Sequence, residues 1–196
     1  MEKNFWKQQM AHEPTRLYFY KLQEIIYNYL LSLSKWKDEC GNPEHLDDEI
    51  FLNVLEIGLD VGISARCFLE FPNIKLTSID SGDIDIGIRE IEAMNTKRWT
   101  FHHMTSDKYF AECKIEFDII YVDGLHTYEQ VKKDADNAWK FLKPDGIIIG
   151  HDIIHKGNFI NDSDCGVAQA FAEFMNEKNV TGIIYPPHPG LIVITK

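Results

Sequence analysis

Short apolar runs alternate with amphipathic stretches along most of this 196-residue chain. Five runs have the length and the β-branched content of strands: Phe51–Ile57, Lys75–Ile79, Trp99–His103, Phe117–Val122 and Gly146–Gly150. Between them, apolar residues recur at helical spacing in Ile63–Phe71, Ile84–Asn95, Ser106–Cys113 and Thr127–Leu142. Strands that alternate with helices predict right-handed βαβ units and a parallel sheet.

Further segments flank this alternation. Residues 1–12 are polar and are expected to be poorly ordered, whereas Pro14 suits the first turn of a helix that we expect to end near Cys40–Gly41. This helix packs on the domain, or it also forms one wall over a substrate site. Gly166–Lys178 predicts a last helix, and Gly182–Tyr185 with Leu191–Thr195 predicts a hairpin-like pair.

The expected fold is therefore α/β, a three-layer sandwich with a mostly parallel seven-stranded sheet and one antiparallel strand near its edge. Residues 1–196 are expected to form a single domain, with a helical extension at 1–48 and the core at 49–196. Residues 151–164 read as a polar loop, more typical of a lid than of a source of metal ligands.

Composition and charge indicate which classes of partner and which cellular location to expect. The formal net charge is −11, which argues against a nucleic acid as partner. No apolar run is long enough for a membrane span, and the first residues lack a signal-peptide core. The four scattered cysteines suggest free thiols, so we expect a cytoplasmic protein. The aromatic N-terminal helix is a candidate interface for a homo-oligomer.

Acids and imidazoles follow two of the predicted strands. Asp123 and His126 come after the fourth strand, and His151 with Asp152 comes after the fifth. Ligands of open α/β sheets bind outside the carboxyl ends of the strands, so these side chains are expected in one crevice. The alternatives are a strand-ending turn at Asp123 and a helix cap at His126. Asp134 is expected on a solvated helix face or as a partner behind the site.

The turn after the first strand, Glu56–Ser64, combines Gly58 and Gly62 with the start of a helix. Glycines let a ligand approach the backbone, and a helix N-terminus attracts a carboxylate or phosphate. Asp60 stands where a dinucleotide fingerprint has its second glycine, and its carboxylate would repel a pyrophosphate. This favours a ligand that carries an ammonium and a carboxylate. A tight turn with packing glycines is the alternative.

Asp80 ends the second strand, where an acid can accept hydrogen bonds from both hydroxyls of a ribose. It could equally be a simple cap. If Asp80 binds a ribose, Thr105 and Ser106 at the end of the third strand would lie near the base of the nucleoside.

These residues resemble the class I S-adenosylmethionine-dependent methyltransferases, which implies a Rossmann-like sheet. The segment EIGLDVGIS is similar to the glycine motif of the catechol-type, cation-dependent O-methyltransferases. The segment VDGLHTYEQVKKDADNAWKFLKPDGIIIGHDI resembles macrolide sugar O-methyltransferases. The resemblance covers roughly residues 50–178.

The resemblance implies roles for individual residues. Those expected to bind S-adenosylmethionine are Glu56, Gly58 and Ser64 at its methionine end, Asp80 at the ribose, Ser106 by the adenine, and also Gly62, Ser81 and Asp123. Those expected to bind a divalent metal, magnesium or manganese, are Asp123, His151 and Asp152. His126 is expected to be the general base, with Asp123 beside it in the catalytic site.

One position departs from the family pattern. The metal-dependent relatives usually carry a carboxylate where this chain has His151, and imidazole suits manganese, iron or zinc better than magnesium. A metal-free site is the alternative.

The expected activity is methyl transfer from S-adenosylmethionine to a hydroxyl of a small metabolite or sugar, with metal assistance left open. The hydroxyl must lose a proton, which a neutral imidazole or a metal can promote. The alternatives are a nicotinamide-dependent oxidoreductase, disfavoured by Asp60, and a non-catalytic module that binds S-adenosylmethionine or a protein partner.

Overall fold

The computed structural model describes residues 5–33, 51–154, 166–186 and 189–196. Its strands are β1 (Leu52–Ile57), β2 (Ile74–Asp80), β3 (Trp99–His103), β4 (Phe117–Val122), β5 (Leu142–Gly150), β6 (Gly182–Tyr185) and β7 (Leu191–Thr195). Its helices are α1 (Phe5–Ala11), α2 (Glu13–Ser32), α3 (Ile63–Leu69), α4 (Asp85–Glu92), α5 (Ser106–Glu112), α6 (Tyr128–Phe141) and α7 (Val167–Lys178). Strand and helix alternate from β1 to β5, as the hydrophobic pattern predicts.

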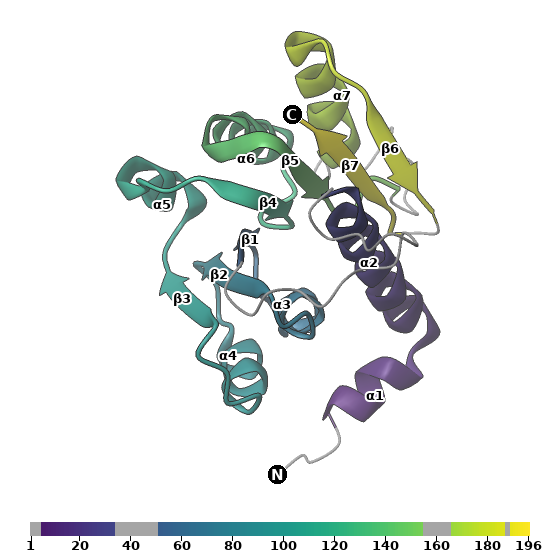
Figure 1. Ribbon diagram of the computed structural model, residues 1–196, viewed down its shortest axis with the longest axis vertical. Helices are drawn as coiled ribbons and strands as arrows, with labels where there is room; N and C mark the ends of the chain where they lie inside the picture. The colour runs from purple at the N-terminus through teal and green to yellow at the C-terminus, as the bar shows by residue number, and fades with distance from the viewer. Residues whose placement is uncertain (1–4, 34–50, 155–165, 187–188) are drawn as a thin grey trace.

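The strands form one seven-stranded sheet in the order β3-β2-β1-β4-β5-β7-β6 (Figure 1). Strands β1 to β5 pair in parallel, whereas β7 is antiparallel to both β5 and β6. The predicted fold class, including the antiparallel strand near the edge, is confirmed. The chain order reverses between β1 and β4, and ligands of such sheets bind at this switch point.

Helices cover both faces of the sheet, so the sandwich has three layers (Figure 1). One apolar cluster joins the sheet to α2, α3 and α4, with Leu22, Ile26 and Phe68 fully buried. A second cluster joins the other face to α5, α6 and α7, with Ala135 and Phe171 fully buried. Because both faces are covered, the central strands are apolar on both sides rather than alternating.

The termini of several elements differ from the prediction. Residues 5–11 form α1, although 1–12 were expected to be poorly ordered. Helix α2 ends at Ser32 rather than near Cys40–Gly41, because Leu33 takes an extended conformation. Strand β5 starts at Leu142, which pairs with Phe117 ahead of a register shift.

Residues 34–50, and the predicted polar loop from residue 155, lie outside the described segments. The division into an extension at 1–48 and a core at 49–196 therefore stays a prediction. Among the described residues, no helix combines the length and the hydropathy that crossing a bilayer requires.

Candidate active site

Two cavities open at the carboxyl edge of the sheet, on either side of the end of β4. The larger, of about 600 Å³, reaches from Asp80 to Asp134, and the smaller, of about 280 Å³, reaches Tyr18 of α2. Four residues line both cavities: Gly58, Asp60, Asp123 and His151. The larger cavity also exposes the predicted residues Ser81, Ser106, His126 and Asp152. The two cavities thus meet at the predicted crevice.

The turn after β1 is fixed by its packing against β4. Gly58 has φ 95°, and a Cβ at this position would lie 2.0 Å from the carbonyl oxygen of Asp123. Gly62 has φ 83° and precedes α3. Both glycines are required by the backbone alone, so their presence does not depend on a ligand.

Asp80 holds this turn from the end of β2. Its Oδ2 accepts hydrogen bonds from the backbone N–H groups of Leu59 at 2.8 Å and Asp60 at 3.3 Å. Its Oδ1 accepts one from Gly82 N–H at 2.7 Å. The carboxylate therefore shapes the wall of the larger cavity. Its expected contact with a ribose stays a prediction.

Glu56 is completely buried behind the walls of the two cavities. It accepts hydrogen bonds of 2.5 Å from the hydroxyls of Ser64 and Ser78, the latter being its register partner on β2. Burial raises the pKa of Glu56 to about 8, although both hydroxyls act in the opposite direction. Ser64 lines the smaller cavity, whereas Glu56 lines neither cavity. A ligand would meet Ser64 first, with Glu56 behind it.

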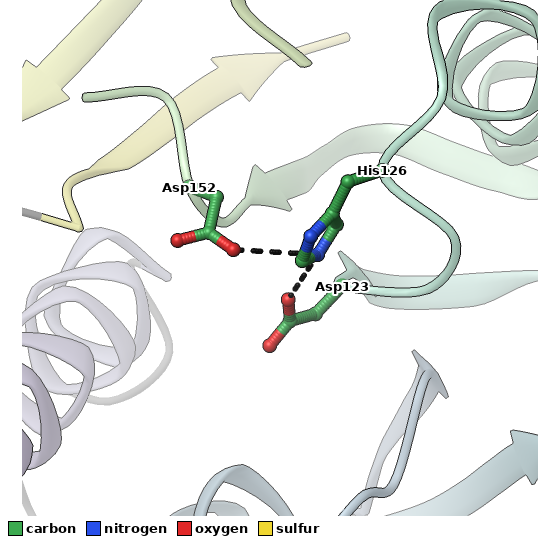
Figure 2. A group of neighbouring side chains, drawn as sticks. All are labelled: Asp123, His126 and Asp152. Carbon is green, nitrogen blue, oxygen red and sulfur yellow. Dashed lines mark hydrogen bonds and ion pairs between the residues drawn. The ribbon is translucent and has the colours of Figure 1, made fainter. Parts of the chain in front are cut away.

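Four polar side chains converge where β4 and β5 end. The Nε2 of His126 lies 3.2 Å from Oδ1 of Asp123 and 3.3 Å from Oδ2 of Asp152, as Figure 2 shows. The Nδ1 of His151 lies 2.9 Å from the same Oδ1 of Asp123. Asp152 has φ 56°, a conformation that non-glycine residues rarely adopt and that is common at functional sites.

The side chains of this cluster shift one another's pKa values. Burial disfavours ionisation of Asp123, but the charges and hydrogen bonds of His151 and His126 outweigh it and lower its pKa to about 2. The hydrogen bond to Asp123 raises the pKa of His126. Burial would lower the pKa of His151, but Asp123 and Asp152 outweigh burial and raise it. Asp123 is therefore a carboxylate that can only accept hydrogen bonds.

Two tyrosines that the sequence did not single out belong to this site. The hydroxyl of Tyr121 donates to Oδ2 of Asp123 at 2.9 Å, and it lies 2.6 Å from the hydroxyl of Tyr18. Since the one proton of Tyr121 goes to Asp123, Tyr18 must donate to Tyr121. The ring of Tyr18 also packs on that of His151, with 4.7 Å between centroids. Helix α2 therefore forms a wall of the site, as the second reading of its sequence proposed.

The far end of the larger cavity is formed by α5 and α6. Asp134 is 1% exposed, so the expectation of a solvated position is wrong. Its Oδ1 accepts a 3.0 Å hydrogen bond from Gln130 Nε2. Helix α6 is capped by Thr127, whose Oγ1 accepts from Gln130 N–H. The reading of His126 as a helix cap is therefore wrong.

A small cation would fit one set of these side chains. Asp123, His126 and Asp152 each offer one ligand atom, and these atoms all lie within 4.8 Å of one another. Two carboxylate oxygens and one imidazole nitrogen suit manganese, iron or zinc. The predicted set had His151 in place of His126. Both histidines contact the shared Oδ1 of Asp123, and metal binding stays a prediction.

Comparison with known proteins shows which family the chain belongs to. Residues 55–153 match a family model described as a methyltransferase domain. No curated protein sequence matches the chain.

Solved structures share the fold at low sequence identity. The O-methyltransferase TomG from Streptomyces achromogenes, in complex with S-adenosylmethionine, has a TM-score of 0.67 and 14% identity over 100% of this chain and 90% of its own. An O-methyltransferase from Bacillus cereus, in complex with S-adenosylhomocysteine, has a TM-score of 0.59 and 18% identity over 74% of each chain. The N-methyltransferase NodS from Bradyrhizobium japonicum has a TM-score of 0.60 and 17% identity over 95% and 97%. At these identities the likeness shows the fold alone.

Proposed function

This chain belongs to the methyltransferase-domain family whose model matches residues 55–153, and from that premise we propose that it transfers a methyl group from S-adenosylmethionine to a hydroxyl oxygen of a small molecule. The charge of the two cavities carries this proposal. Six aspartates line them: Asp60, Asp80, Asp83, Asp123, Asp134 and Asp152. Among the described residues, no lysine or arginine lines either cavity. Such walls attract a sulfonium with an ammonium group and repel the pyrophosphate of a nicotinamide cofactor.

The two cavities suggest how the cofactor would lie. The nucleoside would occupy the larger cavity, with the ribose near Asp80 and Ser81 and the base near Ser106. The methionine end would occupy the smaller cavity beside Ser64. The sulfonium would then lie between them, beside Asp123. Glu56 would act through Ser64 rather than by direct contact, since it lines neither cavity.

Methyl transfer to oxygen needs in-line placement and removal of the hydroxyl proton. His126 suits the second task, because its side chain is 38% exposed and lines the larger cavity. Its Nε2 faces two carboxylates and would keep its proton there, which leaves Nδ1 to accept the proton of the substrate. Asp123 and Asp152 would hold the ring and stabilise the imidazolium that forms.

A metal ion would compete with this use of His126. Asp123, His126 and Asp152 would hold it, and a bound cation would lower the pKa of the substrate hydroxyl. Ligation through Nε2 would displace the proton that faces the carboxylates. His126 can therefore be a general base or a metal ligand, and the two hypotheses can be tested separately. We infer that the role of general base fits the hydrogen bonds of His126 best.

Calorimetry followed by a turnover assay tests the proposal. S-adenosylmethionine and S-adenosylhomocysteine should bind with micromolar or better affinity, and NADH should not bind. A panel of small hydroxyl compounds should then yield S-adenosylhomocysteine with at least one acceptor. Binding of NADH alone would favour an oxidoreductase, whereas cofactor binding without turnover across the panel would favour the non-catalytic module. The absence of a nucleic-acid partner and a cytoplasmic location stay predictions from charge and cysteine distribution.

A further inference from the structure

The buried carboxylate at the far end of the larger cavity adds to the charge of the wall, but no contact with the ligand has been assigned to it so far. Asp134 lies on α6 at 1% exposure and still lines the cavity, next to Ser106 and Gln130. Burial raises its pKa to about 6, while hydrogen bonds from Ser106 and Gln130 act in the opposite direction. At pH 8 it is therefore ionised. A buried charge needs hydrogen-bond partners, and a ligand in the cavity that Asp134 lines would add one to those that Ser106 and Gln130 supply.

The side chains next to Asp134 have already used their donor protons. The amide nitrogen of Gln130 lies 3.0 Å from Asp134 Oδ1 and 3.1 Å from Ser106 Oγ, with a longer contact of 3.5 Å to Asp107. Its two protons are therefore used. Ser106 has one proton, which its hydrogen bond to Asp134 uses. The group offers no side-chain donor to the cavity, only the remaining acceptor capacity of the carboxylate.

Adenine matches this wall through one group. Its ring nitrogens accept hydrogen bonds, and the 6-amino group is the donor on the base. We propose that Asp134 is a specificity-determining residue that accepts a hydrogen bond from the 6-amino group of adenine. This inference rests on the proposed function, since it takes the ligand to be an adenine nucleoside.

The size of the effect follows from the loss of one charged hydrogen bond. A base without the 6-amino group would leave the Asp134 carboxylate short of a partner in a buried wall. Hydrogen bonds to charged groups contribute enough to change affinity by about 10- to 100-fold. The expected discrimination between adenine and the 6-deamino base lies in that range.

The experiment compares two ligands at pH 8 by calorimetry. One is S-adenosylhomocysteine, and the other is its purine riboside analogue with hydrogen in place of the 6-amino group. Wild-type protein should bind the first about 10- to 100-fold more tightly. In Asp134→Ala the ratio should fall to about 3-fold or less, and Asp134→Asn, which keeps one acceptor, should give an intermediate ratio. Asp136→Asn is the control, because Asp136 on the same helix pairs with Lys132 and Lys178 and should keep the wild-type ratio.

The ratio of the two ligand affinities distinguishes recognition of the 6-amino group from a structural role of Asp134. A merely structural role for Asp134 would weaken both ligands alike and leave the ratio unchanged, which would overturn the inference. Equal binding of both ligands to wild-type protein would overturn it as well, with the proposed function intact. If neither ligand bound wild-type protein, the proposed function would fail instead. Should Asp134→Ala not fold, the wild-type and Asp134→Asn ratios decide the matter.

Discussion

Replacement of Glu56 by Gln should make the protein more stable at alkaline pH while weakening cofactor binding. The carboxyl of Glu56 is completely buried, and burial raises its pKa from 4.5 to about 8. The native protein thus binds a proton that the unfolded chain releases above pH 4.5. The contribution of this group is fully present below pH 4.5 and is lost as pH rises towards 8.

The magnitude follows from the same pKa values. At about 1.4 kcal/mol per pH unit, a rise from 4.5 to about 8 corresponds to an upper limit of roughly 5 kcal/mol of lost stability. Glutamine resembles the protonated acid and has no charge to bury. Its amide oxygen can accept from one of the two serine hydroxyls, and its NH2 group can donate to the other hydroxyl oxygen. Glu56→Gln should therefore exceed wild-type stability at pH 8 by several kcal/mol and match it near pH 4.5.

Urea denaturation followed by circular dichroism from pH 4.5 to 8.5 measures this difference. Glu112→Gln, at an exposed position that ends α5, serves as the matched control and should follow the wild-type curve. Parallel wild-type and Glu56→Gln curves across the range would refute the reasoning. A less stable Glu56→Gln at pH 8 would mean that the two serines hold Glu56 as a carboxylate.

Four further predictions concern other parts of the site. Gly58→Ala should lose at least ~2 kcal/mol of stability in urea denaturation, because its Cβ would collide with the Asp123 carbonyl at positive φ; wild-type stability would contradict the packing described. Tyr18→Phe should lower turnover about 10-fold with little change in S-adenosylhomocysteine affinity, because it breaks the hydrogen-bond chain from Tyr18 through Tyr121 to Asp123. Tyr20→Phe, at an exposed position, is the control. Equal rates for the two variants would remove Tyr18 from the site. His126→Ala should lower methyl transfer ~100-fold while S-adenosylhomocysteine still binds. Full activity of wild-type protein in excess chelator would leave only the imidazole route. Complete loss would show that a metal is required, with Asp123, His126 and Asp152 as its candidate ligands.

The fold could be predicted because strand and helix periods alternate without ambiguity between Phe51 and Gly150. The convergence of Asp123, His126, His151 and Asp152 followed from one rule, that the carboxyl ends of parallel strands meet at one edge. Helix α1 was not predicted. The end of α2 was missed because it depends on the backbone conformation of Leu33, which the apolar repeat does not encode.

The parts of the site that were missed involve partners on distant elements. Tyr18 in the N-terminal helix and Tyr121 in the fourth strand were not singled out as site residues, because nothing in the sequence says that α2 lies over β4. A usable signal existed, because buried tyrosine hydroxyls need hydrogen-bond partners. Asp134 was left between a solvated helix face and a partner behind the site, because the helical spacing of α6 does not reveal that its α5-facing side is buried.

The acidic walls have a consequence for the end of the catalytic cycle. Transfer of the methyl group turns a sulfonium into a neutral thioether, so the attraction between the aspartates and the cofactor falls at the moment the product forms. The spent cofactor would then be held less tightly than the fresh one. In this enzyme, the charge that lines the cavities would relieve product inhibition without a conformational change.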